Sequence, residues 1–350
     1  MSQTIELCPN RFVGGNNPVF VIAEAGINHQ GDINIAKELI KAAKEAGADC
    51  VKFQKRTIER ILTKEGLEKP YINNNSFGAT YGEHKRTLEL SYDDFCTLMN
   101  YADDQGIFMT ASGWDEESVD FLYDIGVPFF KVASADLTNF LLLEHTARKG
   151  KPMVLSTGMA NMETVYKAFH LVYNINKNIV ILQCTSTYPA EFSDLNLNVI
   201  KTYQTSFSNA VIGYSGHEKG IAISLATCVM GAKVIERHLT LDRTMKGGDH
   251  SASLEPDGLK KLIRDIRAYE EALGDGIKVK LPSEEKIFIK LSKSVVSKIK
   301  IKAGDELTKE MLTTKGPGIG ISPMDLQKII GMKAKHAIEE DVVITWDDVV

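Results

Sequence analysis

Polar side chains that could do chemistry recur at the ends of short apolar runs in this 350-residue chain. One run, VIERHLT at 234–240, carries Glu236, Arg237 and His238 in a row inside an otherwise apolar segment. The polar residues near the ends of the eight runs are Glu24, Lys52, Gln54, Thr110, Ser112, Lys131, Ser134, Ser156, Thr157, Thr185, Ser186, Ser215, His217, Glu236 and His238. Because scattered surface polarity would not follow the run ends so regularly, this pattern indicates one shared site.

His217 and His238 end two consecutive runs. Adjacent parallel strands lie about 4.8 Å apart, so the two imidazoles could share one divalent metal and leave open positions for water or substrate. The sequence has no HExxH motif and no third obvious His or Cys ligand. This favours an exchangeable Mn²⁺ or Mg²⁺ over structural zinc. A hydrogen-bonded histidine pair without metal explains the spacing equally well.

Lys52 and Lys131 lie inside apolar runs, where an unpaired ammonium group is costly, so each requires a buried anion. A phosphate held by the two lysines and surrounding hydroxyl groups would meet that need. The hydroxyl groups are those of Thr110, Ser134, Ser156, Ser186 and Ser215. Salt bridges to buried carboxylates are an alternative, and a Schiff-base lysine is another. The many hydroxyl groups favour the anion site over the imine.

Carboxylates near the run ends could act as acid, base or acceptor for sugar hydroxyl groups. They are Glu24, Asp136, Glu236 and Asp249. The segment KGGDHSAS at 246–253 has two glycines before Asp249, so this loop can approach a ligand closely. The segment TYGEHKR at 80–86 could form a second anion site through His84, Lys85 and Arg86. Both segments also fit ordinary solvated loops.

The eight apolar runs predict the elements that position these residues. The runs are residues 19–26, 49–54, 107–112, 129–134, 153–158, 179–186, 210–217 and 234–240, and amphipathic helical stretches lie between them. Continuous apolar runs are typical of parallel strands. Eight strand–helix units predict a (β/α)₈ TIM barrel of class α/β, with catalytic residues at the carboxyl ends of the strands. A doubly wound open sheet is the alternative. A β-hairpin in the first 18 residues could close the barrel bottom.

The pattern changes after about residue 275. We predict a TIM-barrel catalytic domain at 1–275, a polar linker at 276–290 and a small β-rich domain at 291–350. The chain is 43% hydrophobic and 25% charged, with a formal net charge of −5, so we expect no nucleic-acid or membrane partner. MSQTIELCPNRF is not a secretory signal. Five cysteines without a CxxC pair indicate reduced core thiols in a cytoplasmic protein.

Several motifs, in this order, resemble those of the sialic acid synthase family over nearly the whole chain. They are AEAGINHQGD, KFQK, FFKVAS, LSTGM, QCTSTYP, IGYSGH, IERHLT and GGDHSASLEP. TYGEHKR and YSGHE are most similar to the animal-type N-acetylneuraminate synthases. KSVVSKIKIKAGDELTKEML resembles the antifreeze-like (SAF) domain that ends these enzymes. The resemblance implies a transferase that condenses phosphoenolpyruvate with an N-acetylmannosamine-type aldehyde and releases phosphate by C–O cleavage.

The resemblance also implies roles for individual residues. Those implied to hold phosphoenolpyruvate are Lys52, Thr110, Lys131, Ser134, Ser156, Ser186 and Ser215, although one bacterial subgroup has Asn where Ser186 stands. His217 and His238 would bind Mn²⁺ or Mg²⁺, and Glu24 would assist proton transfer. The residues expected at the sugar are Gln54, Asp136, Tyr188, Asp249, Lys85 and Arg86. The expected catalytic residues are Glu24, Lys131, His217 and His238.

Animal-type members use the sugar 6-phosphate, and TYGEHKR together with Lys55 and Arg56 could supply its counter-charges. We therefore expect the 6-phosphate, with the free sugar as the alternative. The family resemblance further implies a homodimer with swapped SAF domains. Several bacterial members have KRPG where this chain reads KGPG, so Gly316 replaces an arginine that reaches the partner's sugar. Legionaminic or pseudaminic acid synthases, a Schiff-base aldolase and a carbohydrate- or ice-binding protein are the other interpretations.

Overall fold

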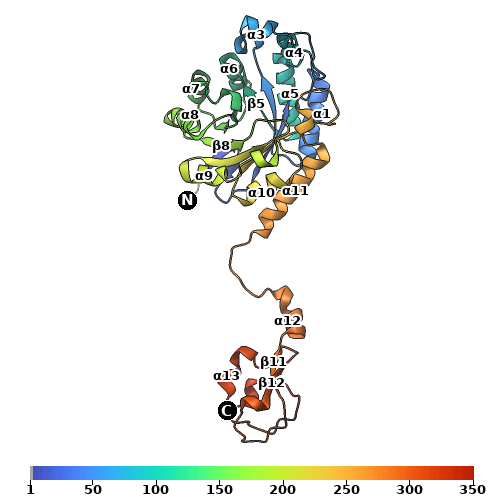
Figure 1. Ribbon diagram of the computed structural model, residues 1–350, viewed down its shortest axis with the longest axis vertical. Coiled ribbons are helices and arrows are strands. Elements are labelled where there is room, and N and C mark those ends of the chain that lie inside the picture. The colour runs from blue at the N-terminus through green and yellow to red at the C-terminus, as the bar shows by residue number, and fades with distance from the viewer. Residues whose placement is uncertain (1–2) are drawn as a thin grey trace. The chain divides into compact units, whose positions relative to one another are not determined.

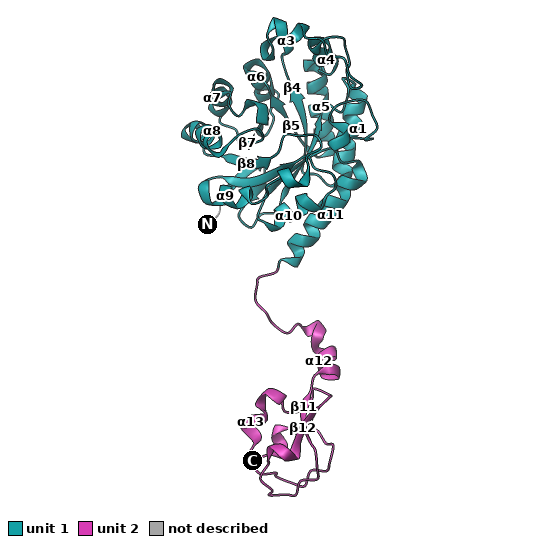
Figure 2. Ribbon diagram, viewed as in Figure 1, with its two compact units in different colours: residues 1–273 teal, residues 274–350 magenta. Residues whose placement is uncertain are grey.

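The structure is a computed structural model that describes residues 3–350. The chain divides into two compact units, Met1–Leu273 and Gly274–Val350, which are coloured separately in Figure 2. Within the described residues, no helix is both long enough and apolar enough to span a membrane.

The first unit is a closed barrel of eight parallel strands (Figure 1) in the order β10-β3-β4-β5-β6-β7-β8-β9, which confirms the predicted TIM barrel. The strands are β3 (Phe20–Gly26), β4 (Cys50–Lys55), β5 (Phe108–Gly113), β6 (Phe130–Val132), β7 (Met153–Ser156), β8 (Ile179–Cys184), β9 (Val211–Gly216) and β10 (Val234–His238). Each coincides with one of the apolar runs, because a strand covered on both faces has no exposed positions that require polar residues.

Helices surround the barrel (Figure 1). They are α1 (Ile33–Ala46), α5 (Tyr92–Gln105), α6 (Glu116–Asp124), α7 (Phe140–Arg148), α8 (Met162–Ile175), α9 (Val199–Ser206), α10 (Ala222–Val229) and α11 (Pro256–Ala272). The sequence specifies α1 clearly. Asp32 caps its start by accepting from the backbone N–H of Asn34, and Gly47, at φ +89°, ends it. The helix buries Leu39 and Ile40 against the barrel core.

The long connection between β4 and α5 carries three short helices, α2 (Ile58–Ile61), α3 (Lys64–Glu68) and α4 (Tyr81–Thr87). Thr80 and Glu83 form a capping box at the start of α4. His84 is buried, and its ring lies against Tyr71, 4.6 Å between centroids, and Tyr81, 6.2 Å. This packing orients α4 so that Lys85, but not Arg86, lines the cavity at the carboxyl ends of the strands.

The predicted N-terminal hairpin is present as β1 (Thr4–Cys8) and β2 (Arg11–Gly14), paired antiparallel. Ile5, Leu7 and Val13 are buried in one cluster with residues from the amino ends of the barrel strands, among them Phe20 and Val234. The hairpin therefore closes the end of the barrel opposite the polar strand ends.

The second unit has its own core, which includes Val295, Ile301, Leu307 and Ile344. Its regular elements are α12 (Glu285–Leu291), β11 (Ser294–Ser297), β12 (Leu312–Lys315) and α13 (Leu326–Ile329). Isolated β-bridges supply the other strand pairing. α12 begins within the segment predicted as a linker and occupies its last six residues, 285–290. Short 3-10 helices in the two units are Ser134–Asp136, Phe192–Asp194, His250–Ala252, Pro282–Glu284, Lys309–Met311, Pro323–Asp325 and Trp346–Asp348.

Candidate active site

A cavity of about 300 Å³ opens at the carboxyl ends of the barrel strands. Most residues singled out from the sequence line it, although they come from all parts of the barrel. They are Glu24, Lys52, Gln54, Lys85, Lys131, Ser134, Ser156, Ser186, Tyr188, Ser215, His217, His238 and Asp249. As expected, polar residues from the strand ends meet in one cavity.

Three residues that were assigned to phosphoenolpyruvate or the sugar lie outside this cavity, as do the strand-end residues Thr157 and Thr185. Thr110 is fully buried one layer below Ser112, and its hydroxyl donates to the carbonyl of Phe129 at 2.6 Å. Asp136 lines an adjoining hollow instead, because Ser134–Asp136 turns away from the barrel axis as a 3-10 helix after β6. Arg86 is 49% exposed, and its Nε donates to Glu59 at 2.9 Å. The structure thus does not bring these three side chains to the cavity wall.

Further residues line the cavity. Ser112, Trp114 and Cys184 were given no role from the sequence, whereas Arg56 was considered as a counter-charge for a sugar phosphate and Glu236 as an acid, base or acceptor. Ser112 and Glu236 carried the same strand-end signal as the expected residues. Arg56 and Trp114 directly follow the ends of β4 and β5, where side chains also face the mouth. Cys184 is buried as expected, but it faces the cavity at the end of β8.

Strand alternation explains why β10 carries three ionisable residues in a row. Glu236 and His238 face the barrel interior, whereas Arg237 faces the surrounding helices and is 0% exposed. Arg237 Nη1 donates to Glu218 Oε1 at 2.9 Å and to Ser224 Oγ at 2.8 Å. Its Nη2 donates to the backbone carbonyl of Glu218 at 2.6 Å. This buried ion pair connects the ends of β9 and β10, the two strands that carry His217 and His238.

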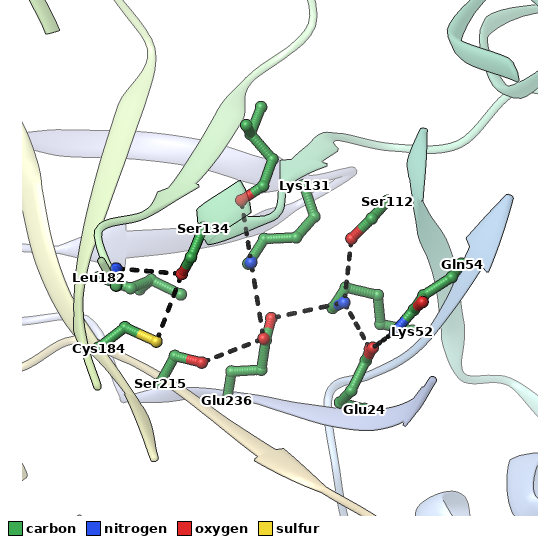
Figure 3. A network of polar contacts seen from close by, with 12 residues as sticks. Glu24, Lys52, Gln54, Ser112, Lys131, Ser134, Leu182, Cys184, Ser215 and Glu236 are labelled. Carbon is green, nitrogen blue, oxygen red and sulfur yellow. Dashed lines mark hydrogen bonds and ion pairs between the residues drawn. The ribbon is translucent and has the colours of Figure 1, made fainter. Parts of the chain in front are cut away.

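Two lysines and two carboxylates alternate on the cavity floor (Figure 3). Lys52 Nζ lies 2.5 Å from Glu24 Oε2 and 4.0 Å from Glu236 Oε2. Lys131 Nζ lies 3.6 Å from Glu236 Oε1. All four side chains are buried, so the salt bridges considered from the sequence are present together with the hydroxyl groups. An anion that enters here would compete with the carboxylates for the lysines.

The two floor carboxylates have different proton affinities. Burial raises the pKa of Glu24 to about 7, although Lys52 opposes the shift. Burial also acts to raise the pKa of Glu236, but the charges of Lys131 and Lys52 outweigh it and lower the pKa to about 2. At neutral pH Glu236 is therefore the permanent counter-ion, whereas Glu24 can hold or release a proton.

Hydroxyl groups surround the lysines. Ser112 Oγ accepts from Lys52 Nζ at 3.2 Å, and Ser215 Oγ donates to Glu236 Oε1 at 3.2 Å. Ser156 Oγ is buried without a hydrogen-bond partner in the described part of the chain. Ser134 Oγ accepts from the N–H of Gly158 at 3.0 Å, and a Cβ at that glycine would lie 2.0 Å from Ser186 Oγ. Only glycine lets Ser134 and Ser186 approach the same point.

The rings of His217 and His238 lie 5.3 Å apart between centroids. His217 Nδ1 lies 2.7 Å from the carbonyl oxygen of Thr185, so Nδ1 carries the proton and Nε2 is left to face the cavity. His238 Nδ1 is buried without a hydrogen-bond partner among residues 3–350. Burial lowers the pKa of His238 to about 4, so this ring is neutral at pH 7. Two imidazoles with available nitrogens fit a metal that takes its remaining ligands from water or substrate.

The protonation of His217 and the number of available protein ligands also affect how well a metal would fit this site. Burial acts to lower the pKa of His217, but the thiol of Cys184, with Sγ 4.0 Å from Nδ1, and the carbonyl of Thr185 shift it upward overall. A metal would therefore compete with a proton at this ring. No group of three or more His, Cys, Asp or Glu residues suited to metal binding occurs within residues 3–350. Any ion held here would have two protein nitrogens as its principal ligands.

Tyr188, Asp249 and Gln54 surround the histidines and Glu24 at the cavity mouth. The Tyr188 ring lies 4.1 Å from that of His217, and Asp249 Oδ2 lies 3.8 Å from His238 Nδ1. Gln54 Nε2 donates to Glu24 Oε1 at 3.2 Å. An aromatic face beside carboxylate and amide groups suits a polyhydroxylated ligand, which presents both C–H and O–H groups.

Comparison with known proteins shows a full-length relationship. The sequence model of the NeuB family matches residues 39–278, and that of the SAF domain matches residues 292–350. N-acetylneuraminate-9-phosphate synthase of Mus musculus is 53% identical, with 100% of this chain and 98% of the mouse protein covered. The Homo sapiens protein of the same name is 52% identical, with 98% and 96% covered.

A solved structure shows the same relationship in three dimensions. The N-acetylneuraminic acid (sialic acid) synthetase of Leptospira borgpetersenii, crystallised in complex with citrate, matches with a TM-score of 0.71 and 35% sequence identity. The match covers 82% of this chain and 95% of that one.

Proposed function

This chain belongs to the NeuB family, and from that premise we propose that it is a sialic acid synthase. The enzyme condenses phosphoenolpyruvate with N-acetylmannosamine 6-phosphate, or with N-acetylmannosamine. The products are N-acetylneuraminate 9-phosphate, or N-acetylneuraminate, and inorganic phosphate. One observation carries the proposal: two buried lysines ringed by hydroxyl groups share a cavity with two histidines whose nitrogens face it.

Phosphoenolpyruvate is proposed to bind on the cavity floor. Its phosphate and carboxylate groups would take Lys52 and Lys131 as counter-ions. They would also accept hydrogen bonds from hydroxyl groups such as that of Ser156, which has no partner within residues 3–350. The other hydroxyl groups of this site are those of Ser134, Ser186 and Ser215. Thr110 supports the floor from below through its bond to Phe129. The lysine charges also stabilise the phosphate as it leaves.

We propose that His217 and His238 hold Mn²⁺ or Mg²⁺ beside this floor. When bound, such an ion supplies a Lewis acid that polarises the sugar aldehyde. The two imidazoles would hold the ion from well-ordered strand ends, because Thr185 fixes the His217 ring and the barrel buries the His238 ring. Metal binding should weaken as the pH falls, since protons compete for the same nitrogens.

The sugar is proposed to lie at the mouth, where Tyr188, Gln54 and Asp249 can position it. C3 of phosphoenolpyruvate attacks C1 of the open-chain aldehyde, and Glu24 delivers a proton to the aldehyde oxygen. Its pKa of about 7 suits this role. Water then adds to C2, and the tetrahedral intermediate collapses to the 2-keto acid as its C–O bond to phosphate breaks. Glu236 stays ionised and keeps both lysines charged and in place.

An end-point assay tests the function. The purified chain is incubated with phosphoenolpyruvate and a panel of 2-acetamido sugars and their 6-phosphates, with and without Mn²⁺. We expect equimolar phosphate and nonulosonic acid from the N-acetylmannosamine compounds, and none in the presence of a chelator. Preference for a diacetylated sugar would instead indicate a legionaminic- or pseudaminic-type synthase. Borohydride trapping of a substrate adduct would support a Schiff-base aldolase.

The remaining organisation is also proposed. We place the catalytic barrel at 1–275, the linker at 276–290 and the SAF domain at 291–350, which agrees with a SAF match that begins at residue 292. We propose a homodimer in which each SAF domain covers the partner's barrel, and sedimentation of the full chain tests the dimer. A cytoplasmic location is part of the proposal, because five free thiols are typical of a reducing compartment.

A further inference from the structure

The cavity has a second pair of cations that the floor chemistry does not use. Arg56 and Lys85 line its rim, away from the lysines on the floor, and Lys85 extends into the adjoining hollow that contains Asp136. A single phosphoenolpyruvate on Lys52 and Lys131 leaves both rim cations without a ligand.

Glu89 fixes one side of the Arg56 guanidinium group, and the Nη2 atom on its other side has no partner among residues 3–350. Arg56 is 2% exposed, and its Nε donates to Glu89 Oε2 at 3.0 Å. Glu89 also accepts from Lys55 Nζ at 2.8 Å, so one carboxylate serves two cations. Arg56 Nη2 is buried and has no hydrogen-bond partner in the described part of the chain. A buried guanidinium N–H without a partner is costly, which indicates that a ligand completes it.

Lys85 adds a second positive charge, and the nearby carboxylates of Asp249 and Glu89 only partly offset it. Lys85 forms no ion pair with any residue between 3 and 350. Burial and the nearby charge of Arg56 lower the pKa of its ammonium group to about 8. Two like charges held together, with the single carboxylate of Glu89 already shared between Arg56 and Lys55, are typical of an anion site.

Trp114 forms the wall that the two cations share. Arg56 Cζ and Lys85 Nζ each lie 5.9 Å from its ring centroid. The indole Nε1–H is buried and has no partner among the described residues. A guanidinium, an ammonium and an indole N–H around one recess match the three oxygens of a phosphate monoester.

We infer that Arg56 and Lys85 bind the phosphate group of a phosphorylated sugar and so determine preference for the sugar 6-phosphate over the free sugar. This inference rests on the proposed function, because the acceptor is the substrate that reaches from the histidines to the rim. Of the counter-charges expected from the sequence, it keeps Arg56 and Lys85. It removes Lys55, which pairs with Glu89, and Arg86, which is directed to Glu59 at the surface.

The test compares kcat/KM for N-acetylmannosamine 6-phosphate and for N-acetylmannosamine, with phosphoenolpyruvate and Mn²⁺ saturating. We expect Lys85→Gln to lower the value for the 6-phosphate about tenfold and Arg56→Gln about a hundredfold, with little change for the free sugar. Arg86→Gln, one position along the same helix, is the matched control and should leave the ratio unchanged. Arg56→Gln also disturbs Glu89 and could prevent folding. In that case the comparison rests on Lys85→Gln.

The outcomes distinguish failure of the proposed synthase function from failure of the phosphate-site assignment. If the unaltered chain condenses neither sugar, the proposed function is wrong. If it condenses both sugars and Lys85→Gln leaves their ratio unchanged, the function stands and the inference is overturned. Equal losses in Lys85→Gln and Arg86→Gln would also overturn it, because they would indicate general attraction of anions. Inorganic phosphate should compete with the sugar 6-phosphate. Loss of this competition in Lys85→Gln, but not in Arg86→Gln, would support a specific phosphate site at the rim.

Discussion

At the scale of single residues, Glu24 and Glu236 are two carboxylates in one cavity with opposite behaviour. Lys52 lies between them, but only Glu236 also has Lys131 as a neighbour. At Glu236 the additional cation outweighs burial and lowers the pKa, whereas at Glu24 burial prevails and raises the pKa. The same residue type therefore serves as a fixed counter-ion in one position and as a proton carrier in the other.

Replacement of Glu24 tests the proton-transfer role. We expect Glu24→Gln to lower kcat about 100-fold or more, because the amide cannot deliver a proton to the aldehyde oxygen. The KM for phosphoenolpyruvate should change far less, since Lys131 and the hydroxyl groups remain. Steady-state kinetics measures both. An unchanged kcat would remove Glu24 from the proton-transfer step.

The pH dependence of sugar preference tests Lys85. Its pKa of about 8 means that the ammonium group loses its charge as the pH rises from 7 to 9. The phosphate is already a dianion in that range, so attraction weakens as the pH increases. The ratio of kcat/KM for the 6-phosphate to that for the free sugar should therefore fall across this interval. In Lys85→Gln the ratio should be flat, and a rising ratio in the unaltered chain would contradict the assignment.

At the scale of elements, the ends of β9 and β10 carry the two histidines, and a buried ion pair behind them fixes their spacing. Glu218 directly follows His217, and Arg237 directly precedes His238. Tyr214 donates its hydroxyl to Glu218 Oε2 at 2.8 Å, so both carboxylate oxygens are engaged. The pair lies on the opposite side of the strands from the cavity and can act on the histidines only through the backbone.

We expect Glu218→Gln to destabilise the barrel by about 3 kcal/mol, since it leaves Arg237 as an uncompensated buried charge. Affinity for Mn²⁺ should also fall, because the two strand ends can shift relative to each other. Urea unfolding and a Mn²⁺ titration followed by electron paramagnetic resonance measure the two effects.

The control for that variant is Arg11→Lys. Arg11 pairs with Asp49 at 2.9 Å near the amino ends of the strands, and its replacement should lower stability without altering Mn²⁺ affinity. If Glu218→Gln unfolds more easily but binds Mn²⁺ normally, the ion pair is structural only.

Strands and strand-end residues could be predicted from the sequence because burial on both faces leaves a simple signal. Lys52 and His238 interrupt continuous apolar runs, and a buried polar group is costly unless it has a partner. Such an interruption therefore indicates a ligand-binding or catalytic site. Placement of Thr110 could not be read in this way. It has the same parity as Ser112 and pairs with the cavity residue Lys52, but its hydroxyl donates to the carbonyl of Phe129 and does not reach the cavity wall.

The long connection after β4 could be predicted even less well. Whether Lys85 or Arg86 faces the cavity depends on the rotation of α4. That rotation is set by the stacking of His84 on Tyr71 and Tyr81, contacts that no periodicity reveals. The partnerless Nη2 of Arg56 likewise results from how Glu89 folds back onto β4.

At the scale of the whole molecule, every residue of the cavity comes from the first compact unit. The proposed sugar, phosphoenolpyruvate and metal sites therefore all use residues of this barrel. The hairpin β1–β2 packs at the opposite end of the barrel, whereas the cavity lies at the carboxyl ends of the strands. The second unit has a separate core of its own.

The most direct test of the account follows the oxygen that bridges carbon and phosphorus in phosphoenolpyruvate. The chain is supplied with phosphoenolpyruvate labelled with oxygen-18 at that position, Mn²⁺ and N-acetylmannosamine 6-phosphate, and the released phosphate is analysed by mass spectrometry. The account predicts that the label leaves with phosphate, in an amount equal to the nine-carbon acid formed. Unlabelled phosphate, or label retained in the carbon product, would contradict it.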